Sequence, residues 1–145
     1  MKVENQVYPD RARQAAYAET PAPDGPIVMV NLLRFRPTAQ YRDGSDAHLT
    51  GREAYQRYAV EVGMLVQKYE GRVVYMGDVT ALQIENVEDL WDEVALVEYT
   101  SRAAFNTMTA APEWQTIAKH REAGLAGQLN IETSPAWPPK RKSPA

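Results

Sequence analysis

The sequence predicts one small α+β domain. Its 145 residues are the size of a single domain, and its apolar (44%) and charged (24%) fractions are ordinary for a globular protein. Some stretches are rich in β-branched and aromatic residues, as strands are, and others place apolar residues three and four positions apart, as helices do. The two patterns alternate along the chain, which indicates strands and helices built around one core.

The first strand is the best indication of a partner. Residues 1–25 are expected to be an N-terminal extension with a short helix over Pro9–Glu19, because the Pro- and Gly-rich segment that follows interrupts regular structure. The domain itself is expected over residues 26–133, and Ile27–Arg36 is its first strand. Both alternating faces of that strand are apolar, which is typical of a strand covered on both sides. Helices cover one face in a two-layer domain, so the sequence predicts a homodimer that covers the other.

A long helix follows a polar loop. Thr50 and Glu53 form a capping box, in which each side chain bonds the other residue's backbone N–H. Gly71 is expected to end the helix in the left-handed conformation. Between them, apolar residues spaced by three and four form one helical stripe, and the three tyrosines among them are interpreted as packing residues in preference to acid catalysts: Tyr55, Tyr58, Ala59, Val62, Leu65, Val66 and Tyr69.

The second half repeats the alternation. Arg72–Ile84 and Trp91–Thr100 predict two strands of a hairpin, and Ser101 predicts the cap of a helix that restarts at Pro112. Residues 128–133 predict the last strand. The order strand, helix, strand, strand, helix, strand is that of ferredoxin-like folds, with a four-stranded antiparallel sheet and two helices on one face. Residues 134–145 are expected to be a disordered, Pro-rich tail with a basic cluster at Lys140–Lys142.

Several short segments form a recognisable set: Asn31-Leu32-Leu33-Arg34-Phe35, Glu53-Ala54-Tyr55 with Tyr58, Trp91, Glu98-Tyr99-Thr100-Ser101, Ala104-Phe105, Pro112-Glu113-Trp114 and Arg121-Glu122-Ala123-Gly124-Leu125. Together they resemble the family called domain of unknown function 1330, within the dimeric α+β barrel superfamily. This resemblance implies that two four-stranded sheets face each other across a dimer barrel. It implies no reaction, because that family has no established activity, although relatives in the wider superfamily include cofactor-free oxygenases, muconolactone-isomerase-like enzymes and haem-binding proteins.

Composition and motifs argue against several classes of function. A net charge of −3 gives no general attraction to phosphate backbones, so nucleic acid is not an expected partner. The chain has no cysteine, no apolar stretch long enough for a signal peptide or a membrane span, no phosphate-cradling glycine loop and no HExxH pattern. We therefore expect a cytoplasmic protein with no metal site and no cofactor.

Polar residues at apolar positions are the candidate site. Asn31 lies among apolar residues of the first strand, Arg121 lies in the apolar stripe of the last helix, and Glu98 follows an apolar strand face. A buried charge without a partner is very costly, so Arg121 is expected to meet a carboxylate. Two interpretations remain open. Glu98 and Arg121 form a structural pair, or the Arg121 stem carries its charge to solvent; alternatively, Arg121 and Asn31 line a pocket that holds an acidic or carbonyl-bearing ligand.

The remaining candidates extend that second interpretation. Tyr99 and Trp91 are candidate lining residues, and Glu98 or His120 is the candidate proton carrier. The leading hypothesis is a dimeric protein that binds a small molecule, such as a cofactor-independent isomerase, decarboxylase or oxygenase. The alternatives are a non-catalytic binding or assembly module and a haem-binding protein that uses His120 as the axial ligand.

Overall fold

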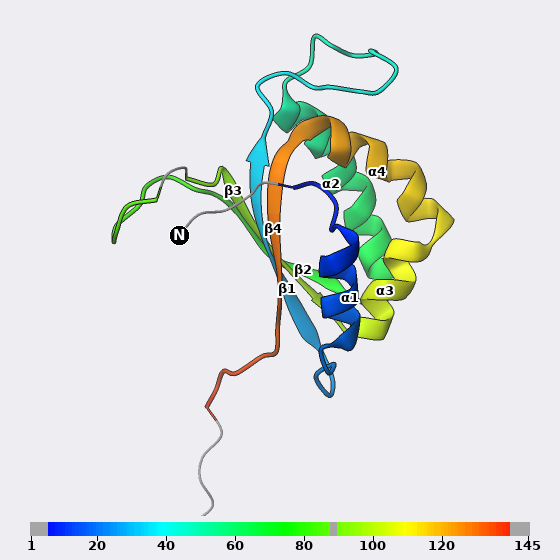
Figure 1. Ribbon diagram of the computed structural model, residues 1–145, viewed down its shortest axis with the longest axis vertical. Coiled ribbons are helices and arrows are strands. Elements are labelled where there is room, and N and C mark those ends of the chain that lie inside the picture. Colours follow the sequence, from blue (N-terminus) through cyan, green and yellow to red (C-terminus); the bar gives the residue numbers. More distant parts are fainter. Residues whose placement is uncertain (1–5, 88–89, 140–145) are drawn as a thin grey trace, which may run out of the picture.

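The structure is a computed structural model that describes residues 6–87 and 90–139. The four strands form one antiparallel sheet in the order β2-β3-β1-β4, and the helices lie on one side of it (Figure 1). This is the predicted ferredoxin-like topology. In chain order the elements are α1 (Arg11–Glu19), β1 (Ile27–Phe35), α2 (Gly51–Lys68), β2 (Arg72–Asp78), β3 (Glu93–Tyr99), α3 (Arg102–Ala110), α4 (Pro112–Gly124) and β4 (Leu125–Thr133).

The helix ends follow the predicted signals with one exception. The capping box is present, since the Glu53 N–H donates to Thr50 Oγ1 over 3.1 Å and the Thr50 N–H donates to Glu53 Oε1 over 3.0 Å. The predicted left-handed residue is wrong: Glu70, with φ of 64°, takes that conformation. Gly71 is required for a different reason, because a Cβ there would lie 2.6 Å from the Glu98 carbonyl oxygen.

The hairpin strands are shorter than predicted. β2 ends at Asp78, not Ile84, and residues 79–87 leave the sheet on the side opposite the helices (Figure 1). The last pair between β2 and β3 is Asp78 with Glu93, and one further backbone bond joins the two segments, from the Val79 N–H to the Asp92 carbonyl oxygen over 2.9 Å. The Asp92 carboxylate accepts from the Phe35 N–H at the end of β1 over 2.8 Å. β4 is longer than predicted, since it follows Gly124 without a loop.

The core lies between the sheet and the helices. Alternate residues of β1 face the helices, and Ile27, Met29 and Leu33 are at most 3% exposed. Two clusters of buried residues fill this layer: Ile27, Met29, Leu65, Val66, Tyr99 and Met108 form the first, and Leu33, Tyr55, Tyr58 and Leu125 form the second.

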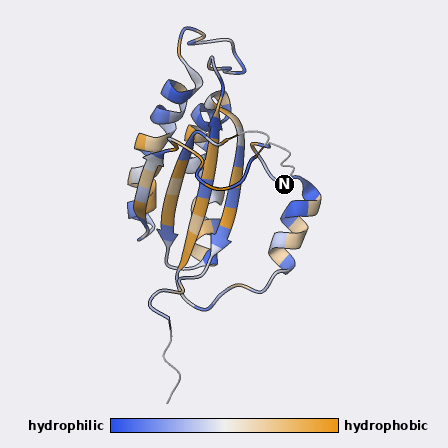
Figure 2. Ribbon diagram, turned by 90° about the vertical axis from the view of Figure 1, so that its left-hand side faces the viewer, coloured by the Kyte–Doolittle hydropathy of each residue, from blue (hydrophilic) through white to orange (hydrophobic). Residues whose placement is uncertain are grey.

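The opposite face of the sheet is apolar and is not covered by the helices. The β1 residues that point there pair across the sheet with apolar residues of β3 and β4, so the apolar surface is continuous over three strands. Figure 2 views the sheet from this side, and its hydropathy colours show many apolar residues along the strands. We call this surface the open face. Its apolar members are Val28, Val30, Leu32, Tyr75, Val94, Leu96, Leu129 and Ile131.

The N-terminal extension packs against the domain and contains the expected short helix, α1. Arg102, which is buried, donates to Glu132 over 2.7 and 2.8 Å and also to backbone carbonyls at the end of α1. Val7 packs against the second core cluster. The extension therefore packs against the core through Val7 and is bonded to Arg102 at the end of α1. In the predicted tail, residues 134–139 form no helix or strand, and the basic cluster lies outside the described residues.

None of the described helices has the length and apolar character needed to cross a membrane.

Candidate functional site

A cavity of about 70 Å³ lies between the sheet and helices α2 and α4. Its apolar walls come from α2, β2 and β3, and its polar groups come from tyrosines, Asn31, Gln128 and Arg121. Three of the residues predicted to bind a ligand, Asn31, Tyr99 and Arg121, line this one cavity. The sequence brings them together because the odd-numbered residues of β1 and β3 and the apolar stripe of α4 face the same layer.

Arg121 is the charged residue of the cavity. Its Nη2 donates to the Val7 carbonyl oxygen over 2.5 Å and to Gln128 Oε1, and its guanidinium lies 5.2 Å from the centre of the Tyr8 ring. Its Nη1 is buried and has no hydrogen-bond partner. All these partners are uncharged, and no described carboxylate forms a salt bridge with Arg121. The expected carboxylate partner is therefore not found in the described part of the chain.

A short chain of amides fixes the orientation of Arg121. Gln128 accepts from Arg121 through Oε1 and donates through Nε2 to Asn31 Oδ1 over 2.7 Å. Asn31 Oδ1 also accepts from Asn130, and Asn31 Nδ2 donates to the carbonyl oxygens of Met29 and Ala95 over 3.3 and 3.2 Å. Every polar group of the Asn31 side chain is thus bonded within the protein, which makes Asn31 a positioning residue of the cavity.

Three tyrosine side chains line the same space. Tyr55, Tyr58 and Tyr99 line the cavity, and each is at most 8% exposed. Burial raises the pKa of all three hydroxyls, so they stay protonated at physiological pH. Tyr58 accepts from Trp114 Nε1 over 3.1 Å, whereas the Tyr55 and Tyr99 hydroxyls form no hydrogen bond with the described residues. The cavity therefore combines one guanidinium with hydroxyls that can donate.

Glu98 lies on the other side of the sheet. Side chains alternate along a strand, so Glu98 cannot share a face with its neighbour Tyr99. It faces the open side and pairs with Arg72 over 3.1 Å between Oε1 and Nε. The interpretation that pairs Glu98 with Arg121 is therefore wrong, and Glu98 has no contact with the cavity.

His120 and Trp91 are also outside the cavity. His120 lies on α4, and its Nδ1 is 2.6 Å from the Tyr41 hydroxyl of the loop before α2. Burial, and then the positive charges of Lys119 and Arg57, lower the pKa of His120. Trp91 precedes β3 at the end of the segment that leaves the sheet. Neither residue lines the space where Arg121 and the tyrosines meet.

Two features were not predicted from the sequence. Gln128, in the last strand, orients both Arg121 and Asn31, and the amide at an inward-facing strand position is the signal that could have indicated it. Glu93 lies two residues before Ala95 of the cavity wall; its Oε1 is buried without a partner, and its Oε2 accepts from Arg52 over 3.2 Å. Burial raises the pKa of Glu93, and the Asp78 carboxylate acts in the same direction.

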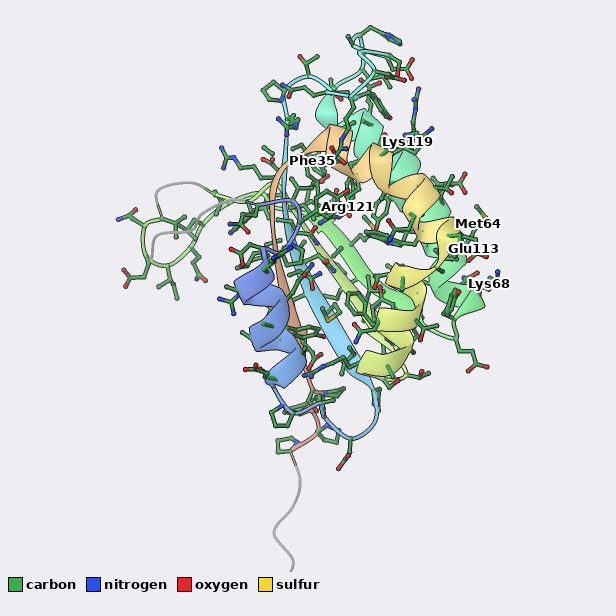
Figure 3. The ribbon with its side chains drawn as sticks, turned by 45° about the vertical axis from the view of Figure 1, so that its right-hand side comes forward. Phe35, Met64, Lys68, Glu113, Lys119 and Arg121 are labelled. Carbon is green, nitrogen blue, oxygen red and sulfur yellow. The ribbon has the colours of Figure 1, made fainter. Side chains whose placement is uncertain are left out.

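A second hollow lies outside the helix layer. It measures about 210 Å³ and is lined by α2 and α4 residues that include Met64, Lys68 and Glu113, which lie on the outer side of the helices, away from Arg121 (Figure 3). Its Lys68 and Glu113 pair with each other over 3.3 Å and are both more than half exposed. Because its charges are paired and solvated, this groove is a weaker candidate than the inner cavity. Among residues 6–87 and 90–139, no cluster of three or more His, Asp or Glu side chains is arranged to hold a metal ion.

Comparisons with known proteins agree on the fold. The model of the family described as "Domain of unknown function (DUF1330)" matches residues 45–132. A crystal structure of the RPA0582 protein of unknown function from Rhodopseudomonas palustris is 32% identical, with a TM-score of 0.82 over 93% of this chain and 100% of that chain. A structure of the methylated RPA0582 protein is 34% identical, with a TM-score of 0.83 over 94% of this chain and 98% of that one.

A more distant likeness supports the fold alone. An uncharacterized NIPSNAP domain protein from Burkholderia xenovorans is 14% identical, with a TM-score of 0.52 over 79% of this chain and 99% of that chain. No curated protein matches this chain.

Proposed function

This chain belongs to the DUF1330 family, whose description names no activity, and we propose from the site itself that it binds a compact anion, such as a small carboxylate, in the cavity beside Arg121. The observation that carries this proposal is the guanidinium of Arg121: it faces only neutral partners, and its Nη1 is buried without one. Burying an unpaired charge or donor is costly, and an anionic ligand would remove that cost. Guanidinium groups bind carboxylates with short, charge-assisted hydrogen bonds.

The size of the cavity limits the ligand. Sites for drug-sized ligands usually measure about 300–1,000 Å³. A cavity of about 70 Å³ fits a ligand of only a few heavy atoms. Tyr55 and Tyr99 both line the cavity, and their hydroxyls form no hydrogen bond with the described residues, which favours a ligand that accepts hydrogen bonds, such as a carboxylate or an enolate, over a halocarbon or a hydrocarbon of equal size.

The lining residues also restrict the chemistry. Donors that meet a developing negative charge stabilise an enolate or another oxyanion. The described lining contains no carboxylate or imidazole that could carry a proton. Decarboxylation of a 3-oxo acid breaks the carbon–carbon bond to the carboxylate, releases CO2 and leaves an enolate that takes a proton from water. It therefore needs the stabilised enolate but no base, whereas isomerisation needs a base to move a proton. Within this proposal, a decarboxylase is favoured over an isomerase.

The proposal includes a homodimer formed through the open face. An apolar surface that extends over three strands of a sheet is a typical interaction site, and a second copy offers the same surface in return. The helices already cover the other side of the sheet, so the cavity stays inside each chain. The chain would then act as a dimer with two separate anion sites.

The test is a calorimetric titration of the protein with formate, acetate and pyruvate, and with acetamide as an uncharged analogue of acetate. We expect a carboxylate to bind and acetamide to bind at least tenfold more weakly. Arg121→Met should abolish the difference, whereas Arg57→Met, which removes an exposed arginine paired with Asp46, should not change it. Tyr99→Phe keeps the shape of the core and should weaken binding several-fold, so the test does not depend on whether Arg121→Met folds. Equal binding of acetate and acetamide, or no binding of any carboxylate, would refute the proposal.

A further inference from the structure

Residues 79–87 form an arm that stands away from the sheet on the same side as the open face. Figure 1 shows this segment extending opposite the helices, and Figure 2 shows it in front of the sheet when the open face is viewed directly. The two views agree, so the arm is placed beside anything that binds the open face.

The base of the arm is fixed to the domain by backbone hydrogen bonds. The Val79 N–H donates to the Asp92 carbonyl oxygen over 2.9 Å, and the Asp92 N–H donates to the Leu33 carbonyl oxygen over 2.8 Å. Arg34 Nη1 adds a bond of 3.0 Å to the Leu90 carbonyl oxygen. These contacts couple the direction of the arm to the end of β1, so the arm is held out from the sheet and is not simply a long turn.

The arm itself is apolar and exposed. Ile84 is 71% exposed, and Leu82 and Val87 are each 44% exposed. Large apolar side chains gathered on a projecting segment are unusual on the surface of a soluble monomer and indicate a contact with another molecule. Ile84 in particular buries little of its surface against its own chain.

We propose that the arm reaches onto a second copy of this chain and forms the outer part of the dimer interface. The inference rests on the proposed dimer. A copy seated on the open face lies beside the arm, and in a two-fold dimer each arm meets the other copy in the same way. The edge of the open face also offers a contact: β2 is an edge strand, and its Tyr75, which points to the open face, is 57% exposed.

This arrangement explains two features together. The open face supplies the apolar centre of the interface. The arm, which follows β2 directly along the chain, supplies an apolar rim that projects beyond it. A stable interface usually buries about 800 Å² on each partner. The arm adds to the area buried in the dimer interface, and its contact with the second copy removes Ile84 from water.

The experiment measures the dimer dissociation constant by sedimentation velocity over a dilution series. Ile84→Lys should raise this constant at least tenfold, because it places a charge in the arm contact while leaving the single chain unaffected. Val60→Lys is the matched control: Val60 is 66% exposed on α2, away from both the arm and the open face, and its variant should dimerise like the parent protein. Leu82→Ser is a second arm variant that adds no charge and should act in the same direction as Ile84→Lys.

Ile131→Lys separates this inference from the proposed dimer. Ile131 is 42% exposed on the open face, so its variant should be monomeric. If the parent protein is monomeric at micromolar concentration, the proposed dimer itself fails. If the parent and both arm variants dimerise with the same constant while Ile131→Lys does not dimerise, the open-face dimer stands and the role of the arm is refuted.

Discussion

The buried pair between Arg102 and Glu132 makes a quantitative prediction about how the N-terminal extension is held. The two side chains are 9% and 12% exposed, and they are joined by two hydrogen bonds of 2.7 and 2.8 Å. Glu132→Gln replaces a carboxylate oxygen with an NH₂ group, which would face a guanidinium N–H as donor against donor. Tyr17, whose hydroxyl donates to Glu132 Oε2 and whose ring lies 4.5 Å from Arg102, would lose its strongest acceptor.

The size of the effect follows from burial. Removing one partner of a buried ion pair costs about 3–5 kcal/mol. Arg102 keeps the backbone carbonyls at the end of α1 as acceptors, so we expect the lower end, a loss of about 3 kcal/mol in the free energy of unfolding at pH 7. For a chain of this length that corresponds to a fall of about 10 °C in Tm. Urea unfolding followed by circular dichroism measures it.

The pH dependence of this loss is a second check on the same pair. The hydrogen bond from Arg102 lowers the pKa of Glu132 in the folded protein. A carboxyl with a lowered folded-state pKa contributes its stability above its unfolded value, about 4.3, and loses it as the pH falls through the folded value. The difference between the parent and Glu132→Gln should therefore be complete at pH 7 and shrink below about pH 4.

The control is Glu113→Gln. This residue belongs to an exposed pair with Lys68, and such pairs contribute about 0–1 kcal/mol. If Glu132→Gln costs no more than this control at pH 7, or if its cost does not depend on pH, the pair does not hold the extension as we describe.

The remaining predictions concern Glu93 and two glycines of α2. Burial raises the pKa of Glu93, so the charged form of this residue opposes folding at pH values above an ordinary carboxyl pKa. Glu93→Gln should therefore leave the free energy of unfolding at pH 7 unchanged or higher, because Arg52 keeps Asp78 as a partner. A loss above about 1 kcal/mol would contradict this. Gly63→Ala should stabilise the protein by about 0.5–1 kcal/mol, since the added methyl group meets no atom within 4 Å in a helix interior. Gly51→Ala should destabilise the protein strongly, because its Cβ would lie 2.2 Å from the Arg36 carbonyl oxygen. Urea unfolding of the Gly63→Ala and Gly51→Ala variants measures both effects, and the same change in stability for the two variants would contradict this prediction.

Local signals predicted most of the fold. The capping box at Thr50, the cap at Ser101 and the restart at Pro112 each act through backbone groups a few residues away, so the sequence alone determines them. The end of β2 could not be predicted in this way. The apolar pattern continues past Asp78, but β3 begins at Glu93, opposite Asp78, so the end of β2 depends on the extent of its partner strand and not on residues 79–84 alone.

The candidate site was predicted in part, for a similar reason. Arg121 stood out because a charge interrupts an apolar helical stripe, and it does line the cavity. The sequence analysis placed both Glu98 and Tyr99 in this site. Neighbouring residues of a strand point to opposite faces of the sheet, so only one of the two can line the cavity. The partners of Arg121 were not predictable, since Val7 lies 114 residues away in a segment that looked separate from the domain.

The anion site beside Arg121 is tested most directly by X-ray crystallography of crystals soaked in sodium bromide, because bromide is a compact anion that anomalous scattering locates without a model of the ligand. We expect a bromide ion in the inner cavity, in contact with Arg121 Nη1 and a tyrosine hydroxyl, and no such ion there in Arg121→Met crystals. Bromide bound only at the protein surface, with water alone in the cavity of the parent protein, would contradict it.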